Sequence, residues 1–136
     1  MHACTDVTGF GLAGHAMEMA THTEAGETFR HGEGVSLGIS AVLAIGESHL
    51  QLPPDIAEEA RDLLQAYKLP VSFSASKYGY RRQELIDLCM KLMLKDKKRK
   101  DNRLRFILID TLGHAGVHIG VPESEIRAAF NMVIEE

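Results

Sequence analysis

A histidine, a glycine and a glutamate stand where a polar segment changes into an apolar one. His31-Gly32-Glu33 leads directly into a segment with the composition of a buried helix. A histidine at such a loop-to-helix junction can direct a ring nitrogen into a cleft, where it can hold a divalent metal or transfer a proton. The alternative is an exposed loop histidine without a role in any site, and the triplet alone favours this alternative.

A second histidine lies inside an expected helix. His15 and Glu18 are three residues apart and therefore share one helix face. This spacing fits a site histidine oriented by a carboxylate, but on spacing alone a core histidine bonded to a neighbour is favoured. His22 lies nearly on the same face, at a frayed helix end. The other histidines have no informative neighbours in the sequence: His2, His49, His114 and His118.

A dense run of cations follows in the C-terminal half. Residues 95–100 read Lys-Asp-Lys-Lys-Arg-Lys, and Arg103 and Arg105 come soon after. Such cations can converge on a phosphate or carboxylate, bind a nucleic acid, or form a solvated helix end. No aromatic residue alternates with the charges, which weakens the nucleic-acid interpretation. Arg105 differs from the others, because it begins an apolar strand whose alternation places it opposite Leu104 and Phe106.

The composition is that of an ordinary globular chain. Of its 136 residues, 45% are hydrophobic and 25% are charged, which is enough apolar material for one core. The net charge of −4 argues against nucleic-acid binding by the chain as a whole. Two distant cysteines, Cys4 and Cys89, fit a reducing compartment rather than a disulfide framework. We find neither a signal peptide nor an apolar run long enough for a membrane, so we expect a cytoplasmic protein.

The elements expected to position these residues are mostly helices. One helix is expected over Phe10–Thr21, where Gly11 and Gly14 weaken it and suggest close approach by another backbone or a ligand. A polar, glycine-rich loop should follow. Gly34–His49 should then form a central helix, because its many small residues let neighbouring elements pack tightly.

The remaining expectations follow in chain order. They are a helix that begins at Pro53-Pro54 and ends at Leu69-Pro70, a loop over residues 71–81, a helix over Gln83–Lys95, strands over Arg103–Asp110 and Ala115–Val121 that turn at Gly113, and a last helix opened by Pro122. The last helix carries its apolar face on Ile126, Ala129, Phe130 and Val133. The predicted fold is therefore mainly α, a single domain over residues 1–136 with one small β-hairpin.

Two stretches together resemble a known family. FRHGEGVSLGISAVL at Phe29–Leu43 resembles the His-Gly-Glu motif of 3-dehydroquinate synthase and the helix after it. KDKKRKDNRLRFILIDTLGHAGV at Lys95–Val117 is similar to that family's Asp-Lys-Lys segment, its Arg/Lys-Phe-x-Leu-Leu strand and its Gly-x-Ala turn. Residues 53–70 resemble the family less specifically. The resemblance covers residues 28–136 and implies the C-terminal helical domain of that enzyme.

The resemblance implies a reaction and roles for four residues. Family members bind NAD and a divalent metal, usually zinc, and act on a phosphorylated sugar acid. They convert 3-deoxy-arabino-heptulosonate 7-phosphate into 3-dehydroquinate and phosphate, a step of the shikimate pathway. A transient oxidation by NAD allows phosphate elimination, after which the ketone is reduced and the ring closes again. The resemblance makes His31 a metal ligand, His15 a catalytic histidine near the substrate phosphate, Arg105 a phosphate-binding cation and Lys97 a member of the basic shell.

The chain departs from the family at the metal site. Where the family has a metal-binding histidine four residues before the position of His15, this chain has Gly11, and Thr8 replaces an asparagine. The family's glutamate ligand and NAD site belong to an N-terminal domain that this sequence does not contain. We therefore expect the chain alone to bind neither zinc nor NAD tightly. We also expect it to be inactive without a separate NAD-binding domain or subunit.

Residues 2–20 carry a different resemblance. HACTDVTGFGLAGHAMEMA is similar to the TDVTGFGLxGH motif of selenophosphate synthetase, an ATP-dependent enzyme in which the aspartate matched by Asp6 helps to hold magnesium. Because both families can have a Gly-His-Ala-x-Glu string here, we hypothesise that the chain joins the two at that string. Two alternatives stay open: a truncated selenophosphate synthetase-like protein, and a non-catalytic helical module that binds an anion or a partner.

Overall fold

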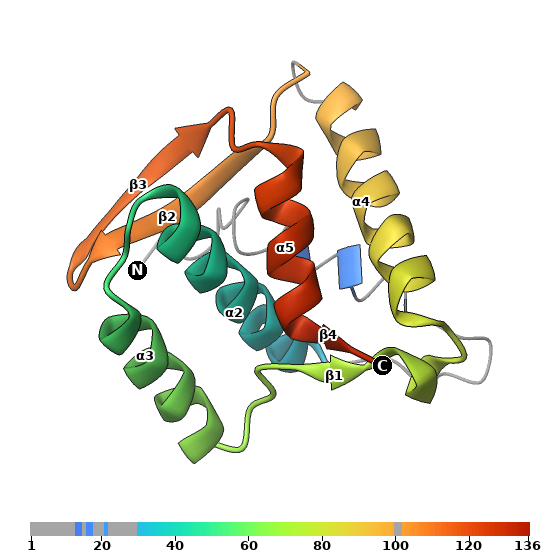
Figure 1. The fold of residues 1–136 in the computed structure, drawn as a ribbon, viewed down its shortest axis with the longest axis horizontal. Coiled ribbons are helices and arrows are strands. Elements are labelled where there is room, and N and C mark those ends of the chain that lie inside the picture. Colours follow the sequence, from blue (N-terminus) through green and yellow to red (C-terminus); the bar gives the residue numbers. More distant parts are fainter. Residues whose placement is uncertain (1–12, 15, 18–20, 22–29, 100–101) are drawn as a thin grey trace.

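The computed structural model describes residues 13, 14, 16, 17, 21, 30–99 and 102–136, without the side chains of residues 31 and 96–99. Residues 13, 14, 16, 17 and 21 are helical. The elements that follow are α2 (His31–His49), α3 (Pro54–Ala66), β1 (Phe73–Ser74), a 3-10 helix η1 (Ala75–Tyr78), α4 (Arg82–Arg99), β2 (Arg105–Thr111), β3 (His114–Ile119), α5 (Glu123–Val133) and β4 (Ile134–Glu135). The prediction of a mainly helical fold with one small hairpin is confirmed (Figure 1).

The helix α2 runs through the middle of the fold. It packs against α3, α5 and β2, and Leu37 and Ile45 on it are fully buried (Figure 1). This agrees with the expected central helix. Among the described residues, none of the helices combines the length and the apolar character needed to cross a membrane.

The start of α2 differs from the prediction by three residues. The helix begins at His31 rather than at Gly34, so the His-Gly-Glu triplet forms its first turn. The backbone N–H of Arg30 donates a hydrogen bond of 2.9 Å to the Glu33 carboxylate. A glutamate that reaches back in this way satisfies a donor at the helix start, which explains why the helix extends into a sequence with two glycines.

A close backbone contact joins the N-terminal helical residues to α2. A Cβ atom built at Gly14 would overlap the carbonyl oxygen of Gly34 and lie 3.0 Å from its carbonyl carbon and 3.7 Å from the Cα of Gly38. Ala13, Ala16 and Met17 beside it are buried in the main core. The expectation that a glycine here allows close approach by another backbone is confirmed at Gly14.

The hairpin forms as expected, but its first strand begins at Arg105, two residues later than predicted. Strands β2 and β3 pair antiparallel, from Arg105 opposite Ile119 to Thr111 opposite His114. Gly113 in the turn has a φ of 81°, a left-handed conformation that glycine adopts without strain. On one face of β2, Phe106 is fully buried in the core, whereas Arg105 is half-buried on the opposite face.

Most of the basic segment lies in a helix that extends beyond its predicted end. The helix α4 continues to Arg99 instead of ending at Lys95. Lysine and arginine are good helix formers, and cations near a helix C-terminus interact favourably with the helix dipole. The chain then turns at Asn102, whose φ is 60°.

The C-terminal segment closes the domain in a way that the sequence did not predict. The last helix buries Ile126, Ala129, Phe130 and Val133 as expected. Beyond it, β4 pairs in parallel with β1, inside the stretch expected to be a loop. Arg82 donates hydrogen bonds to the carbonyl oxygens of Asn131 and Ile134, so it satisfies acceptors at the end of α5.

The contact at Gly14 predicts opposite effects for two glycine-to-alanine substitutions. Gly14→Ala should lower the free energy of unfolding by about 1–3 kcal/mol, because the added methyl group meets backbone that cannot move aside. Gly32→Ala is the matched control, since a Cβ there meets no described atom within 4 Å. It should leave stability unchanged or raise it by up to about 1 kcal/mol. Urea unfolding followed by circular dichroism measures both, and equal effects would contradict the packing described.

Candidate functional site

The contact between Gly14 and Gly34 brings two motif-bearing segments together. Residue 14 immediately precedes His15, and residue 34 follows the triplet that begins at His31. The backbone contact therefore places the chain segments that carry these histidines side by side. Residue 15 and the side chain of His31 lie outside the described part of the chain, so the convergence of the two imidazoles stays a prediction.

The first turn of α2 has features suited to an anion. His31 occupies the first helical position, and the Glu33 carboxylate is engaged by the N–H of Arg30. The positive end of the helix dipole lies at this turn, where it favours a negatively charged group. Among the described residues, no heavy atom lies within 4 Å of a Cβ built at Gly32. The described residues thus leave room beside this turn.

Arg105 lies where the alternation of β2 predicted. It is half-buried, while Leu104 and Phe106 on either side are buried. These two neighbours belong to the same core cluster as Ala13 and Leu37, so β2, α2 and the N-terminal helical residues all meet there. Whether the guanidinium converges with His15 and His31 stays a prediction.

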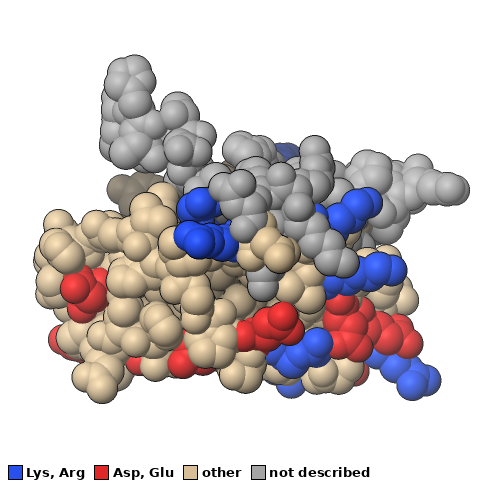
Figure 2. Space-filling view, turned by 90° about the horizontal axis from the view of Figure 1, so that it is seen from above, with Lys and Arg blue, Asp and Glu red and all other residues tan. Residues whose placement is uncertain are grey.

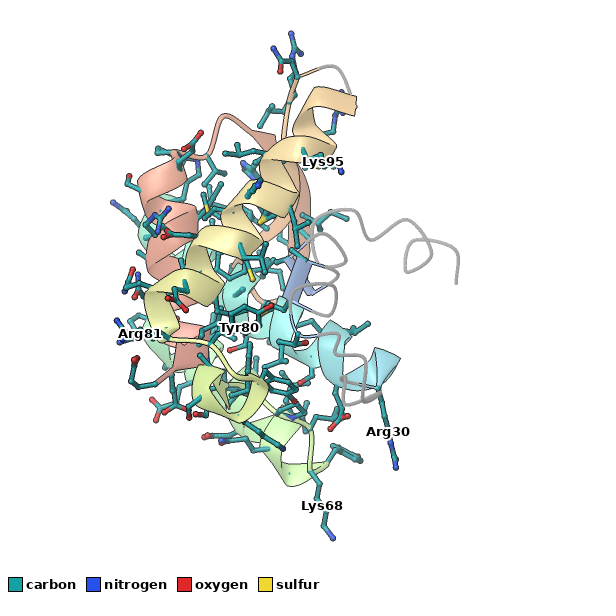
Figure 3. All side chains as sticks on the ribbon, turned by 90° about the vertical axis from the view of Figure 1, so that its right-hand side faces the viewer. Arg30, Lys68, Tyr80, Arg81 and Lys95 are labelled. Atoms are coloured by element: carbon teal, nitrogen blue, oxygen red, sulfur yellow. The ribbon has the colours of Figure 1, made fainter. Side chains whose placement is uncertain are left out.

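Lys97 lies in the last turns of α4, and its side chain is outside the described part. Lys91 and Lys95 on the same helix are exposed. Figure 3 places Lys95 at the opposite end of the view from Arg30, which marks the start of α2. Figure 2 shows lysines and arginines mixed with acidic residues at one end of the molecule, without a continuous basic surface among the described side chains on that face. Lys95 thus lies apart from the first turn of α2.

Two histidine–carboxylate pairs lie elsewhere in the fold. The Nδ1 of His49 on α2 lies 2.9 Å from Oε2 of Glu125 on α5. The imidazole rings of His49 and of His118 on β3 are arranged edge to face, with their centroids 6.4 Å apart. His114 lies 2.7 Å from Asp110 in the hairpin, and this hydrogen bond lowers the pKa of Asp110 below its usual value. The first pair joins residues 76 positions apart, so no local sequence signal could have revealed it.

The described side chains do not form a metal centre. No group of three histidines, cysteines, aspartates or glutamates among them could hold an ion. A catalytic zinc site needs about three protein ligands. His31, the expected ligand, has no described side chain, and Gly11 lies outside the described residues.

Cys89 is unsuited to nucleophilic chemistry. It is fully buried in α4, and burial raises the pKa of its thiol to about 12. Because the thiolate is the reactive form, the thiol is inert near neutral pH. Cys89 is therefore a packing residue of the core.

Comparison with known sequences points to one family. The sequence model of the family described as 3-dehydroquinate synthase C-terminal matches residues 10–99. This range contains both sides of the Gly14–Gly34 contact. It also begins inside the segment for which the sequence alone suggested a resemblance to selenophosphate synthetase. The hypothesis that the chain joins two families stays a prediction.

Curated relatives match along most of the chain. The 3-dehydroquinate synthase of Mycolicibacterium vanbaalenii is 31% identical over 117 residues, which cover 86% of this chain and 30% of the relative. That of Nitrobacter hamburgensis is 40% identical over 120 residues, 84% of this chain and 30% of the relative. The 3-dehydroquinate synthase of Chlorobaculum tepidum is 32% identical over 107 residues, which cover 77% of this chain and 28% of the relative. The chain spans about 30% of the length of the curated relatives it matches.

The burial of Cys89 predicts a thiol that reacts only after unfolding. In the folded chain at pH 8, iodoacetamide should leave Cys89 unmodified, because its pKa of about 12 keeps it protonated and the core excludes the reagent. In guanidinium chloride the same residue should be alkylated completely. Mass spectrometry of the Cys89 peptide distinguishes the two states. Alkylation of Cys89 before unfolding would show that the core around α4 opens readily.

Proposed function

The chain belongs to the family of 3-dehydroquinate synthase C-terminal domains, and from this premise we propose that it supplies the helical half of such an enzyme's active site. The reaction proposed is the family's conversion of 3-deoxy-arabino-heptulosonate 7-phosphate into 3-dehydroquinate and phosphate. The family match over residues 10–99 supports this assignment. So do the relatives, which are named 3-dehydroquinate synthase.

The observation that carries the proposal is the backbone contact of Gly14 with Gly34. It holds the segment of His15 against the turn that begins at His31, although 15 residues separate the two in the sequence. Residues that act on one substrate must be fixed relative to one another. A glycine-to-glycine contact provides such fixation, because two backbones in contact cannot slide without losing packing.

In this proposal the chain binds the phosphate end of the substrate. Arg105 donates two parallel hydrogen bonds to phosphate oxygens, a geometry for which the planar guanidinium is suited. His15 lies next to the leaving phosphate and acts as the catalytic histidine. Lys97 adds positive charge at longer range. The open, positive end of α2 at residues 31–33 contributes further to anion binding.

NAD supplies the transient oxidation in the family reaction, and we propose that its site lies in a separate domain or subunit. The described residues do not fit a metal ion, since they contain no group of three ligands that could hold one. His31 remains the proposed ligand, and we expect weak zinc binding by the chain alone.

The proposal predicts that phosphate binding depends on Arg105. Isothermal titration of the chain with inorganic phosphate should give a dissociation constant that rises about tenfold or more in Arg105→Gln, because one charged hydrogen-bond donor is worth about 1.5–3 kcal/mol. Arg103→Gln removes the same charge from an exposed position two residues away and is the control. It should change the constant less than about threefold.

Two results of this titration would count against the proposal. Equal weakening by both substitutions would show that phosphate responds only to the net charge of the basic segment. Unchanged binding in Arg105→Gln would place the phosphate site elsewhere.

The proposal also predicts that the 136-residue chain alone has no synthase turnover. The reaction needs a nicotinamide that takes and returns a hydride. The sequence has a GxGxxG string at residues 9–14, but no strand is expected before it, as a dinucleotide-binding turn requires. Release of phosphate from 3-deoxy-arabino-heptulosonate 7-phosphate, in the presence of NAD and zinc, measures the activity. Phosphate release above the rate without protein would refute the division of the site between this chain and an NAD-binding part.

A further inference from the structure

Ser36 on α2 is a polar residue in the buried part of the helix, where it is only 1% exposed. A serine inside a helix commonly bonds to the carbonyl group four residues earlier or points to solvent. Here the Oγ of Ser36 instead donates a hydrogen bond of 2.7 Å to the carbonyl oxygen of Pro70, 34 positions away. Because a buried hydroxyl costs free energy unless it is bonded, this long-range bond compensates for the serine at this position.

The carbonyl group of Pro70 is itself held by the end of α3. The backbone N–H of Leu69 donates a hydrogen bond of 3.0 Å to the carbonyl oxygen of Leu64, which closes the last turn of that helix. Lys68 has a φ of 61°, the left-handed conformation in which helices often end. The bond from Ser36 therefore attaches the N-terminal part of α2 to a turn whose backbone is already fixed.

The bond from Ser36 and the contact with Gly14 hold α2 from opposite sides. Successive residues of an α-helix lie about 100° apart around its axis, so residue 36 lies about 200° from residue 34, and residue 38 returns to within about 40° of it. Gly34 and Gly38 form the face that meets Gly14. Ser36 lies on the other face, where it meets Pro70. Contacts on two opposite faces fix the rotation of the helix about its own axis as well as its position.

The rotation of α2 determines where its first turn lies relative to the rest of the fold. Residue 31 precedes residue 34 by three positions, so it lies within about 60° of Gly34 around the helix axis, on the face that meets Gly14. A rotation of α2 would carry residue 31 away from residues 13–17. In the proposed function, residue 31 is the metal ligand and residues 31–33 assist anion binding. Both roles require that the turn keeps one orientation.

We propose that Ser36 is a positioning residue of the candidate site, which acts through its bond to Pro70 and does not touch the substrate. The inference rests on the proposed function, because that function assigns a role to the first turn of α2. Without the hydroxyl, α2 keeps its contact with Gly14 and loses the contact on the opposite face. The first turn then samples several rotations, and its donors no longer converge with Arg105 on one phosphate.

Nuclear magnetic resonance of the isotope-labelled 136-residue chain, titrated with inorganic phosphate, tests the proposal in Ser36→Ala. In the free variant, the amide residual dipolar couplings of residues 32–38 should change relative to those of α5, because the first turns of α2 no longer keep one orientation. The dissociation constant for phosphate should rise about fivefold or more, since a displaced donor loses most of a charged hydrogen bond.

Ile86→Val is the control for a loss of stability alone. It removes one methylene group from a fully buried core residue on α4, a different helix. Both substitutions should lower the urea midpoint of unfolding by a similar amount, about 0.5 M. Ile86→Val should nevertheless leave the couplings of residues 32–38 unchanged and alter the dissociation constant less than about twofold.

The outcomes distinguish this inference from the proposed function. If the wild-type chain binds no phosphate, the proposed function fails, and the role of Ser36 in the site fails with it. If the wild-type chain binds phosphate, but either the couplings or the dissociation constant of Ser36→Ala match those of Ile86→Val, only the role of Ser36 is overturned. The contact of Gly14 with Gly34 would then hold the first turn of α2 without help from the opposite face.

Discussion

The arrangement of this domain depends on the contact between Gly14 and Gly34. Neither residue has a side chain, so two helical segments approach until backbone meets backbone, with Gly38 completing the surface. Because Ala13, Ala16 and Met17 are buried in the same core as Leu37, the contact is supported by apolar packing on both sides. In the proposed function, this contact brings together site residues that are distant in sequence. A larger residue at position 14 would separate the two segments.

Features set by local periodicity could be predicted from the sequence. Alternation along RLRFILID predicted a strand in which Arg105 lies opposite Leu104 and Phe106, and the burial of these residues agrees. The helical spacing of Ile126, Ala129, Phe130 and Val133 predicted the buried face of α5 in the same way. Two glycines in the first helix predicted close approach, although not which residue would be approached. Periodicity reports a buried face but does not identify the partner that buries it.

Features that depend on contacts between distant segments, or on a balance between helix capping and helix propensity, could not be predicted. The pairing of β1 with β4 and the contact of His49 with Glu125 join segments far apart in the sequence. The start of α2 depends on the Glu33 carboxylate, whose capping interaction outweighs the low helix propensity of Gly32. The helix α4 was expected to end at Lys95, but lysine and arginine favour helix, and no glycine or proline interrupts α4 before Arg99. The roles of His15, His31 and Lys97 follow from family resemblance and remain proposals.

The central claim is that the segment of residues 13–17 lies against the first turns of α2 and so builds a site there. The most direct test is a nuclear Overhauser experiment on the isotope-labelled chain in solution. We predict cross-peaks between the α-protons of Gly14 and those of Gly34 or Gly38, since the backbones are in contact. If these cross-peaks are missing, and residues 13–17 instead show contacts only to other elements, the proposed site at the start of α2 does not exist.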